Sequence, residues 1–203
     1  MNNVRFIKAA LLCGIILPFF AFSSIALAIA ASPWFNWGNN ALSDLGVEGV
    51  SALIFNSGLI FSGLLGVVFS LGLLNLYRSA GLLRVGSVLL LLSSLLLSSI
   101  GLFPETAGRI HFYVSLGFFA LTPISLIVIG IGLIWTKFPK TGLTILLLSL
   151  SSGIPWLFPW SGLAIPETLA ATLIVAALFT LSSASLRLLR PPFRGNMFSR
   201  ELH

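Results

Sequence analysis

Residues 52–76 read ALIFNSGLIFSGLLGVVFSLGLLNL, a continuous stretch that holds no charged side chain. A helix needs about 20 mainly apolar residues to cross the hydrocarbon core of a bilayer. The stretch satisfies that length and predicts a membrane-spanning helix. Comparable apolar runs recur along the whole chain, so the same prediction extends in both directions from it.

The composition of the chain agrees with this prediction. Of 203 residues, 57% are hydrophobic and only 8% are charged, with a mean hydropathy of +1.07, whereas soluble domains carry roughly 25% charged residues. The net charge of +6 comes from basic residues at helix ends, a pattern that indicates membrane orientation and contact with anionic lipids, not nucleic-acid binding. The single cysteine, Cys13, excludes an intramolecular disulfide and a thiolate metal site.

Six spanning segments are predicted, and together they give an all-α membrane bundle that forms a single domain over residues 1–203. The predicted helices cover about 9–31, 52–76, 85–103, 111–135, 141–158 and 167–186, and a basic tail follows at 187–203. An Ala-Leu-Ala tripeptide at 26–28 resembles a signal-peptidase site. However, the first apolar run exceeds the roughly 7–15 residues usual for a signal peptide, so we favour a retained helix.

Basic residues predict the orientation of the bundle. Every Lys and Arg except Arg109 falls at the N-terminus, near 77–84, near 136–142 or in the C-terminal tail. Because basic residues concentrate in cytoplasmic loops, the sequence predicts a cell-membrane protein with both termini in the cytoplasm. Residues 34–49 would then lie on the external side.

Residues 34–49, WFNWGNNALSDLGVEG, form the longest polar interruption between apolar segments. Ionisable residues at a membrane boundary are costly unless they are paired or solvated, which makes them default candidates for function. Three external connections are expected to bring such residues to one face. The candidate ligand-binding residues are Asn40, Ser43, Asp44, Asn56, His111, Ser115 and Glu167, and the candidate catalytic residues are Asp44, His111, Glu105 and Glu167.

These residues suggest two kinds of chemistry. His111 with Asp44 and a glutamate could bind a divalent cation, or His111 could act as a general base that a carboxylate orients. Either arrangement suits hydrolysis or transfer on a lipid headgroup at the outer leaflet. Zinc sites commonly supply more nitrogen or sulfur ligands than one histidine, so we expect no metal and no cofactor, with Asp44 and His111 as weak candidates only.

The same residues also have a structural interpretation. The tripeptide Pro-Glu-Thr occurs at 104–106 and again at 166–168, where Pro would suit the first helical position and Glu the first helical turn. Asp44 would then cap a short helix, and Arg109 would pair with Asp44 or Glu105. Both interpretations remain open from the sequence.

Small residues form a stripe along the predicted helix at 52–76. Gly58, Ser62 and Gly66 are spaced one turn apart, which permits close helix–helix approach within the bundle or with a homo-oligomer or membrane-protein partner. A groove left open for a lipid chain is the competing interpretation. Asn56 lies in the outer turn of the same helix, and we favour a hydrogen bond to a neighbouring segment over a ligand role for its amide.

Several motifs together resemble a known family. NALSDLGVEG at 40–49 is followed by IFNSGLIFSG at 54–63, FP at 103–104, RIHFYVSLGFF at 109–119 and AIPE at 164–167. This pattern is similar to the domain of unknown function 998 family of prokaryotic multi-pass membrane proteins. The resemblance covers most of the chain and implies the architecture without implying a reaction. Its motif positions here are Asn40, Ser43, Asp44, Gly46, Asn56, Gly58, Pro104, His111, Ser115 and Glu167.

Familiar catalytic motifs are missing from the sequence. It contains no Gly-rich phosphate loop, no H-E-x-x-H and no G-x-S-x-G, and no charged residue is expected in mid-span, as an ion-coupled transporter would need. We therefore expect a non-enzymatic membrane protein whose polar external pocket binds a lipid, a small molecule or a membrane partner. An outer-leaflet lipid-modifying hydrolase or transferase is the alternative, and a permease is the third possibility.

Overall fold

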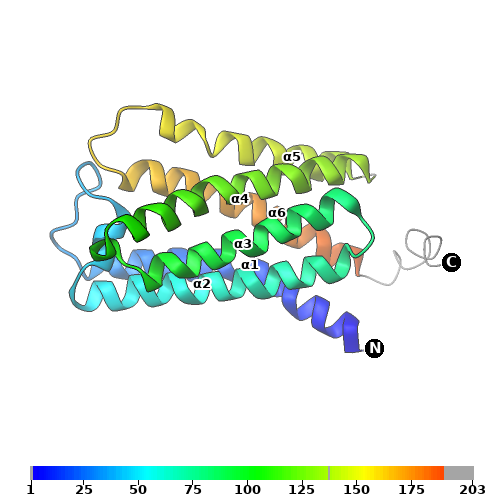
Figure 1. The fold of residues 1–203 in the computed structure, drawn as a ribbon, viewed down its shortest axis with the longest axis horizontal. Coiled ribbons are helices and arrows are strands. Elements are labelled where there is room, and N and C mark those ends of the chain that lie inside the picture. The colour runs from blue at the N-terminus through cyan, green and yellow to red at the C-terminus, as the bar shows by residue number, and fades with distance from the viewer. Residues whose placement is uncertain (1, 137, 190–203) are drawn as a thin grey trace.

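The structure, a computed structural model, describes residues 2–136 and 138–189, and within them it consists of helices and their connections. Six α-helices follow one another in an up-and-down bundle (Figure 1). They are α1 (Asn2–Ala30), α2 (Gly49–Leu76), α3 (Gly81–Leu102), α4 (Arg109–Trp135), α5 (Pro139–Ser151) and α6 (Ala164–Leu188). Three short 3-10 helices lie in the connections, namely η1 (Leu42–Gly46), η2 (Glu105–Ala107) and η3 (Ile154–Leu157).

The helices form a closed ring. Each packs against the next along the chain, and α6 returns to pack against α1. The connections that contain η1, η2 and η3 gather at one end of the bundle, which we call the loop end (Figure 1). The start of α1 and the end of α6 both lie at the opposite end. We call this opposite end, where Arg78, Arg84, Lys140 and Arg187 lie, the basic end.

Five of the helices, all except α5, are long and apolar enough to cross a membrane. The outward surfaces of these helices are also apolar, as contact with lipid requires, because large side chains such as Leu53, Phe61 and Leu95 are exposed around the bundle. Four exposed tryptophans lie at the loop end, where aromatic side chains are typical of a membrane interface. They are Trp34, Trp37, Trp156 and Trp160.

Helix α5 is shorter than the predicted segment at 141–158. It ends at Ser151 and is followed by η3, in which Pro155 lacks the backbone N–H that a continuing helix would need. At 1.5 Å per residue, its 13 residues span only about 20 Å. Figure 1 shows that α5 and the segment after it nevertheless carry the chain back along the bundle to the loop end.

The boundaries of other helices also differ from the predicted ones. Helix α1 begins well before residue 9, and α6 begins at Ala164 and runs through the start of the predicted tail, of which residues 190–203 lie outside the described residues. Glu105 does not open the fourth helix as predicted. It belongs to η2, and Gly108, at φ +61°, separates that turn from α4 because only glycine adopts this conformation without strain.

The small-residue stripe on α2 is used inside the chain. Gly58 lies directly against Ser24 of α1, and Gly66 lies against Ser94 of α3, while Ser62 is fully buried. The face that we expected to be available to a membrane partner or a second copy therefore packs within this bundle. Association with a partner stays a prediction.

Serines of α3 satisfy their hydroxyls within helices, as serines in apolar segments commonly do. The hydroxyls of Ser87, Ser94 and Ser99 donate to carbonyls one turn back along α3, at 2.7 to 2.9 Å. Ser98 differs, since its hydroxyl donates across the helix interface to the carbonyl of Ile60 on α2 at 3.0 Å. This bond fixes the register of α2 against α3.

Candidate functional site: an interhelical cavity under the polar loop

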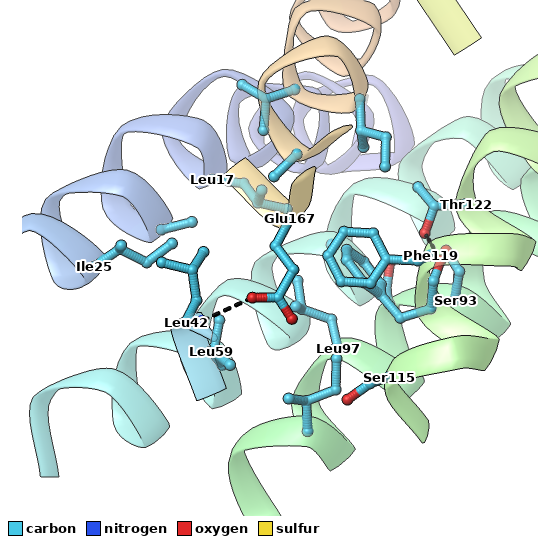
Figure 2. A pocket seen from close by; sticks show the side chains of 18 of the residues that line it. Leu17, Ile25, Leu42, Leu59, Ser93, Leu97, Ser115, Phe119, Thr122 and Glu167 are labelled. Atoms are coloured by element: carbon cyan, nitrogen blue, oxygen red, sulfur yellow. Dashed lines mark hydrogen bonds between the residues drawn. The ribbon is translucent and has the colours of Figure 1, made fainter. Parts of the chain in front are cut away.

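The core of the bundle is divided into two apolar clusters. One is centred on residues such as Phe69, Leu73 and Ile129 towards the basic end, and the other on Leu45 and Phe55 at the loop end. A cavity of about 110 Å³ lies between them, lined by α1, α2, α3, α4, α6 and η1 (Figure 2). Helix α5 contributes no lining residue among those described. The ring of helices thus encloses a space that the two clusters leave unfilled.

Most of the cavity wall is apolar. Leu59, Leu97 and Phe119 are typical of it. Deeper hydroxyls do not face the space as free groups, because Ser94 donates to the Leu90 carbonyl at 2.8 Å and Thr122 to the Phe118 carbonyl at 2.7 Å. Polar groups concentrate at the loop end of the wall, where Ser43, His111, Ser115 and Glu167 contribute to it. The cavity therefore has one polar end and an apolar interior.

Glu167 joins this polar end to the loop above it. The backbone N–H of Leu42, the first residue of η1, donates to Oε2 of Glu167 at 2.7 Å. Figure 2 shows the side chain extending from α6 into the cavity, between Leu42 on one side and Leu97 on the other. One carboxylate oxygen thus holds η1, and Oε1 has no protein partner among the hydrogen bonds of the described residues.

Two further hydrogen bonds hold residues 34–49 in place. The N–H of Ala164 donates to the carbonyl of Asn40 at 2.8 Å. The side-chain amide of Asn56 donates to the carbonyl of Gly46 at 2.9 Å. Gly46 is required there, because a Cβ atom would overlap Oδ1 of Asn56. The loop is therefore anchored to both α2 and α6 above the cavity.

Asp44 acts within its own loop. Its Oδ2 accepts hydrogen bonds from the Asn40 side chain at 2.7 Å and from the Ala41 N–H at 3.0 Å. This is the capping role that the structural interpretation assigns to it. Asp44 does not line the cavity.

Glu105 brings the connection between α3 and α4 against residues 34–49. Its carboxylate lies within hydrogen-bonding reach of the Asp44 carboxylate and the Ser43 hydroxyl. Partial burial, followed by the hydrogen bond and charge of Asp44, raises the pKa of Glu105 above its ordinary 4.5, while Ser43 and His111 oppose that shift. Two carboxylates in such contact favour sharing one proton. Glu105 and Asp44 therefore form an acidic pair between η2 and η1.

This pair predicts a pH dependence of stability. Because the folded-state pKa of Glu105 lies above 4.5, the folded protein binds this proton more tightly than the unfolded chain does. The stabilisation is complete below pH 4.5 and is lost as the pH rises through the raised pKa. Glu105→Gln should remove this part of the loss, measured as the free energy of unfolding between about pH 4 and pH 7. Glu48→Gln, at an exposed position, is the matched control and should leave the profile unchanged.

His111 and Ser115 lie one turn apart on α4 and face the cavity together. Nδ1 of His111 bonds to the carbonyl of Phe103 at 2.8 Å, and Nε2 lies 3.3 Å from the Ser115 hydroxyl. A carbonyl only accepts, so Nδ1 carries the proton, and in the neutral ring Nε2 is the acceptor. His111 is thus oriented by a backbone carbonyl, where the catalytic hypothesis required a carboxylate.

The structure separates the predicted site residues into two groups. Ser43, His111, Ser115 and Glu167 line the cavity, whereas Asn40, Asp44 and Asn56 hold the loop and lie outside its wall. Sequence reasoning missed the apolar wall, including Ala21, Leu97 and Phe119. No signal in the sequence distinguishes these residues from ordinary packing positions, because all lie in uniformly apolar helices. The ligand-binding and catalytic roles stay predictions.

Metal binding has no support in the geometry. Across residues 2–136 and 138–189, no group of three or more His, Cys, Asp or Glu side chains is placed to hold a metal ion. Asp44 and His111 each influence the pKa of Glu105. However, the Asp44 carboxylate already accepts hydrogen bonds from the Asn40 side chain and the Ala41 N–H.

Comparison with known proteins identifies the family. A family model described as "Protein of unknown function (DUF998)" matches residues 15–184. The chain belongs to this family. The match spans α2 to α5 entirely, the second half of α1 and most of α6, so the cavity and its loop lie within the DUF998 region. No curated protein and no solved structure gives a significant match.

Proposed function

We propose that this DUF998 protein is a six-span protein of the cell membrane that binds an apolar or amphipathic molecule in the cavity under residues 34–49. The observation that carries the proposal is the cavity itself, which has an apolar interior and one polar end. Ligand sites are typically enclosed, mostly apolar and provided with a few convergent polar groups.

The proposed topology has both termini in the cytoplasm and the loop end outside. Support comes from the closed ring, in which α5 and η3 return the chain to the loop end, and from the placement of basic residues. Arg78, Arg84, Lys140 and Arg187 all belong to the end opposite the loops. Basic residues favour the cytoplasmic side. The tryptophans of the loop end would lie at the external interface.

Cysteine labelling tests this topology. In a Cys13→Ser background, Glu48→Cys should react with a membrane-impermeant maleimide in intact cells, because residue 48 is exposed at the loop end. Ser79→Cys, in the exposed turn between α2 and α3, should react only after permeabilisation. The reverse pattern would contradict the proposed orientation. Gly46 is unsuited to labelling because it is buried against Asn56.

Binding is better supported than hydrolysis. Acyl transfer requires hydrogen-bond donors aimed at a developing oxyanion, and the polar end of the cavity offers mainly acceptors. The Ser115 hydroxyl approaches Nε2 of His111 at 3.3 Å, but no donor pair accompanies them among the lining residues described. Those residues also include no Lys or Arg that could stabilise such a charge.

Native mass spectrometry of the purified protein tests the binding function. The wild-type protein should retain a bound molecule, and Ala21→Phe should abolish this retention because Ala21 lines the cavity and the larger ring would fill it. Ala26→Phe, an exposed position on the same helix, is the matched control and should bind as the wild type does. Equal retention by all three proteins would place the molecule elsewhere and overturn the proposal.

A further inference from the structure

The shape of the cavity limits what it can hold. From Glu167 to Leu178, both in its wall, α6 advances about 16 Å at 1.5 Å per residue. From His111 to Thr122, α4 covers the same length. Since the volume of about 110 Å³ extends over this distance, the cavity is long and narrow. It has room for part of one alkyl chain and not for the two chains of a phospholipid.

The polar end restricts the headgroup. Nδ1–H of His111 is bonded to the Phe103 carbonyl, and the Ser43 hydroxyl is engaged by Glu105. Oε2 of Glu167 already accepts the Leu42 N–H, and its Oε1 has no protein partner among the hydrogen bonds of the described residues. The remaining capacity of these groups is therefore to accept hydrogen bonds.

The charged residues near the polar end of the cavity also disfavour an anionic headgroup. No Lys or Arg belongs to the described cavity wall, and the exposed Arg109 at the start of α4 lies outside it. Glu105 and Asp44 lie close enough to Glu167 to influence its carboxylate. An anionic headgroup would lie against Glu167, with Glu105 and Asp44 nearby and no Lys or Arg in the described wall, and a carboxylate would bring no donor for the free acceptors.

We infer that the ligand is a single-chain amphiphile whose headgroup donates hydrogen bonds and carries no negative charge, such as a long-chain alcohol or amine. This inference rests on the proposed function and specifies the chemistry of the same cavity. The alkyl chain lies between α1, α3, α4 and α6, and the O–H or N–H of the head donates to Oε1 of Glu167. The Ser115 oxygen provides a second acceptor.

A matched series of probes tests the headgroup. Protein freed of co-purified molecules is incubated with 1-tetradecanol, tetradecylamine, tetradecanoate or tetradecyl phosphate, and binding is measured by native mass spectrometry and by thermal stabilisation. The alcohol and the amine should bind at least about tenfold more tightly than the two anions, a factor that one charge-assisted hydrogen bond supplies. An anion that binds as tightly as the alcohol would overturn the inference.

Glu167→Gln tests the assigned acceptor. Its amide oxygen can still accept the Leu42 N–H, but its NH₂ group replaces the free acceptor by a donor. The variant should keep the Leu42 amide protected from hydrogen exchange, while alcohol and amine binding weakens about tenfold. Unchanged binding of both probes, with Leu42 protected, would contradict the role of Glu167.

The two proposals fail in different ways. If Ala21→Phe abolishes binding of all four probes and the wild type binds them equally, the cavity is the site and the headgroup inference is wrong. If no probe binds, or if Ala21→Phe binds each probe as the wild type does, the proposed function itself is wrong.

Discussion

Gly63→Ala should be among the most damaging single-methyl additions to this protein. A Cβ atom at Gly63 would overlap the Ser98 hydroxyl, the Ser98 backbone nitrogen and the Ser94 carbonyl of α3. Two of these three atoms belong to the backbone and cannot move independently of the helix. We expect α2 and α3 to separate, at a cost of about 1–3 kcal/mol in the free energy of unfolding, and the Ser98–Ile60 hydrogen bond to be lost with them.

The measurement is unfolding by SDS titration in mixed micelles, followed by circular dichroism. Gly81→Ala is the control on α3, because nothing lies within 4 Å of the position that its Cβ would occupy. Alanine there should be neutral or slightly stabilising, since glycine is the poorer helix former by roughly 0.5–1 kcal/mol. Equal effects of the two substitutions on the free energy of unfolding would contradict the prediction, because the close α2–α3 contact exists only at Gly63.

The fold was predictable from the sequence to the extent that hydropathy determines it. Long apolar segments such as residues 52–76 predicted α2 and the other long helices, because an apolar run of that length has few alternatives to a spanning helix. Helix α5 was less predictable. Its end depends on Gly153 and Pro155 within a segment whose hydropathy continues to about residue 158.

The candidate site was predictable only at its polar end. Ser43, His111, Ser115 and Glu167 were identified because polar groups are rare in this chain and therefore visible. Asp44 was overvalued, since its carboxylate is satisfied by the neighbouring Asn40 and Ala41. Leu97 and Phe119 could not be identified, because a cavity arises from how helices fail to meet, and no local sequence pattern records that.

Glu167→Ala should open the loop end of the bundle. The substitution leaves the Leu42 N–H, in a largely buried position, without its acceptor, and an unsatisfied buried donor costs about 1–3 kcal/mol. Because this bond and the Asn40–Ala164 bond are the hydrogen bonds that join residues 34–49 to α6 in the described part of the chain, the penalty should fall on the loop more than on the helices. Hydrogen exchange of the Leu42 amide should accelerate about tenfold or more.

Comparison with the glutamine variant makes the experiment specific. Glu167→Gln retains an oxygen for the Leu42 N–H, so exchange at Leu42 should stay slow in that protein and become fast only in Glu167→Ala. Amides at the opposite end of the bundle, such as that of Leu73 in the basic-end cluster, should exchange at wild-type rates in both variants. Since the loop covers the polar end of the cavity, Glu167→Ala should also release a bound amphiphile faster. Wild-type exchange at Leu42 in the alanine variant would mean that the Asn40 and Asn56 contacts alone hold the loop, and that Glu167 serves the cavity only.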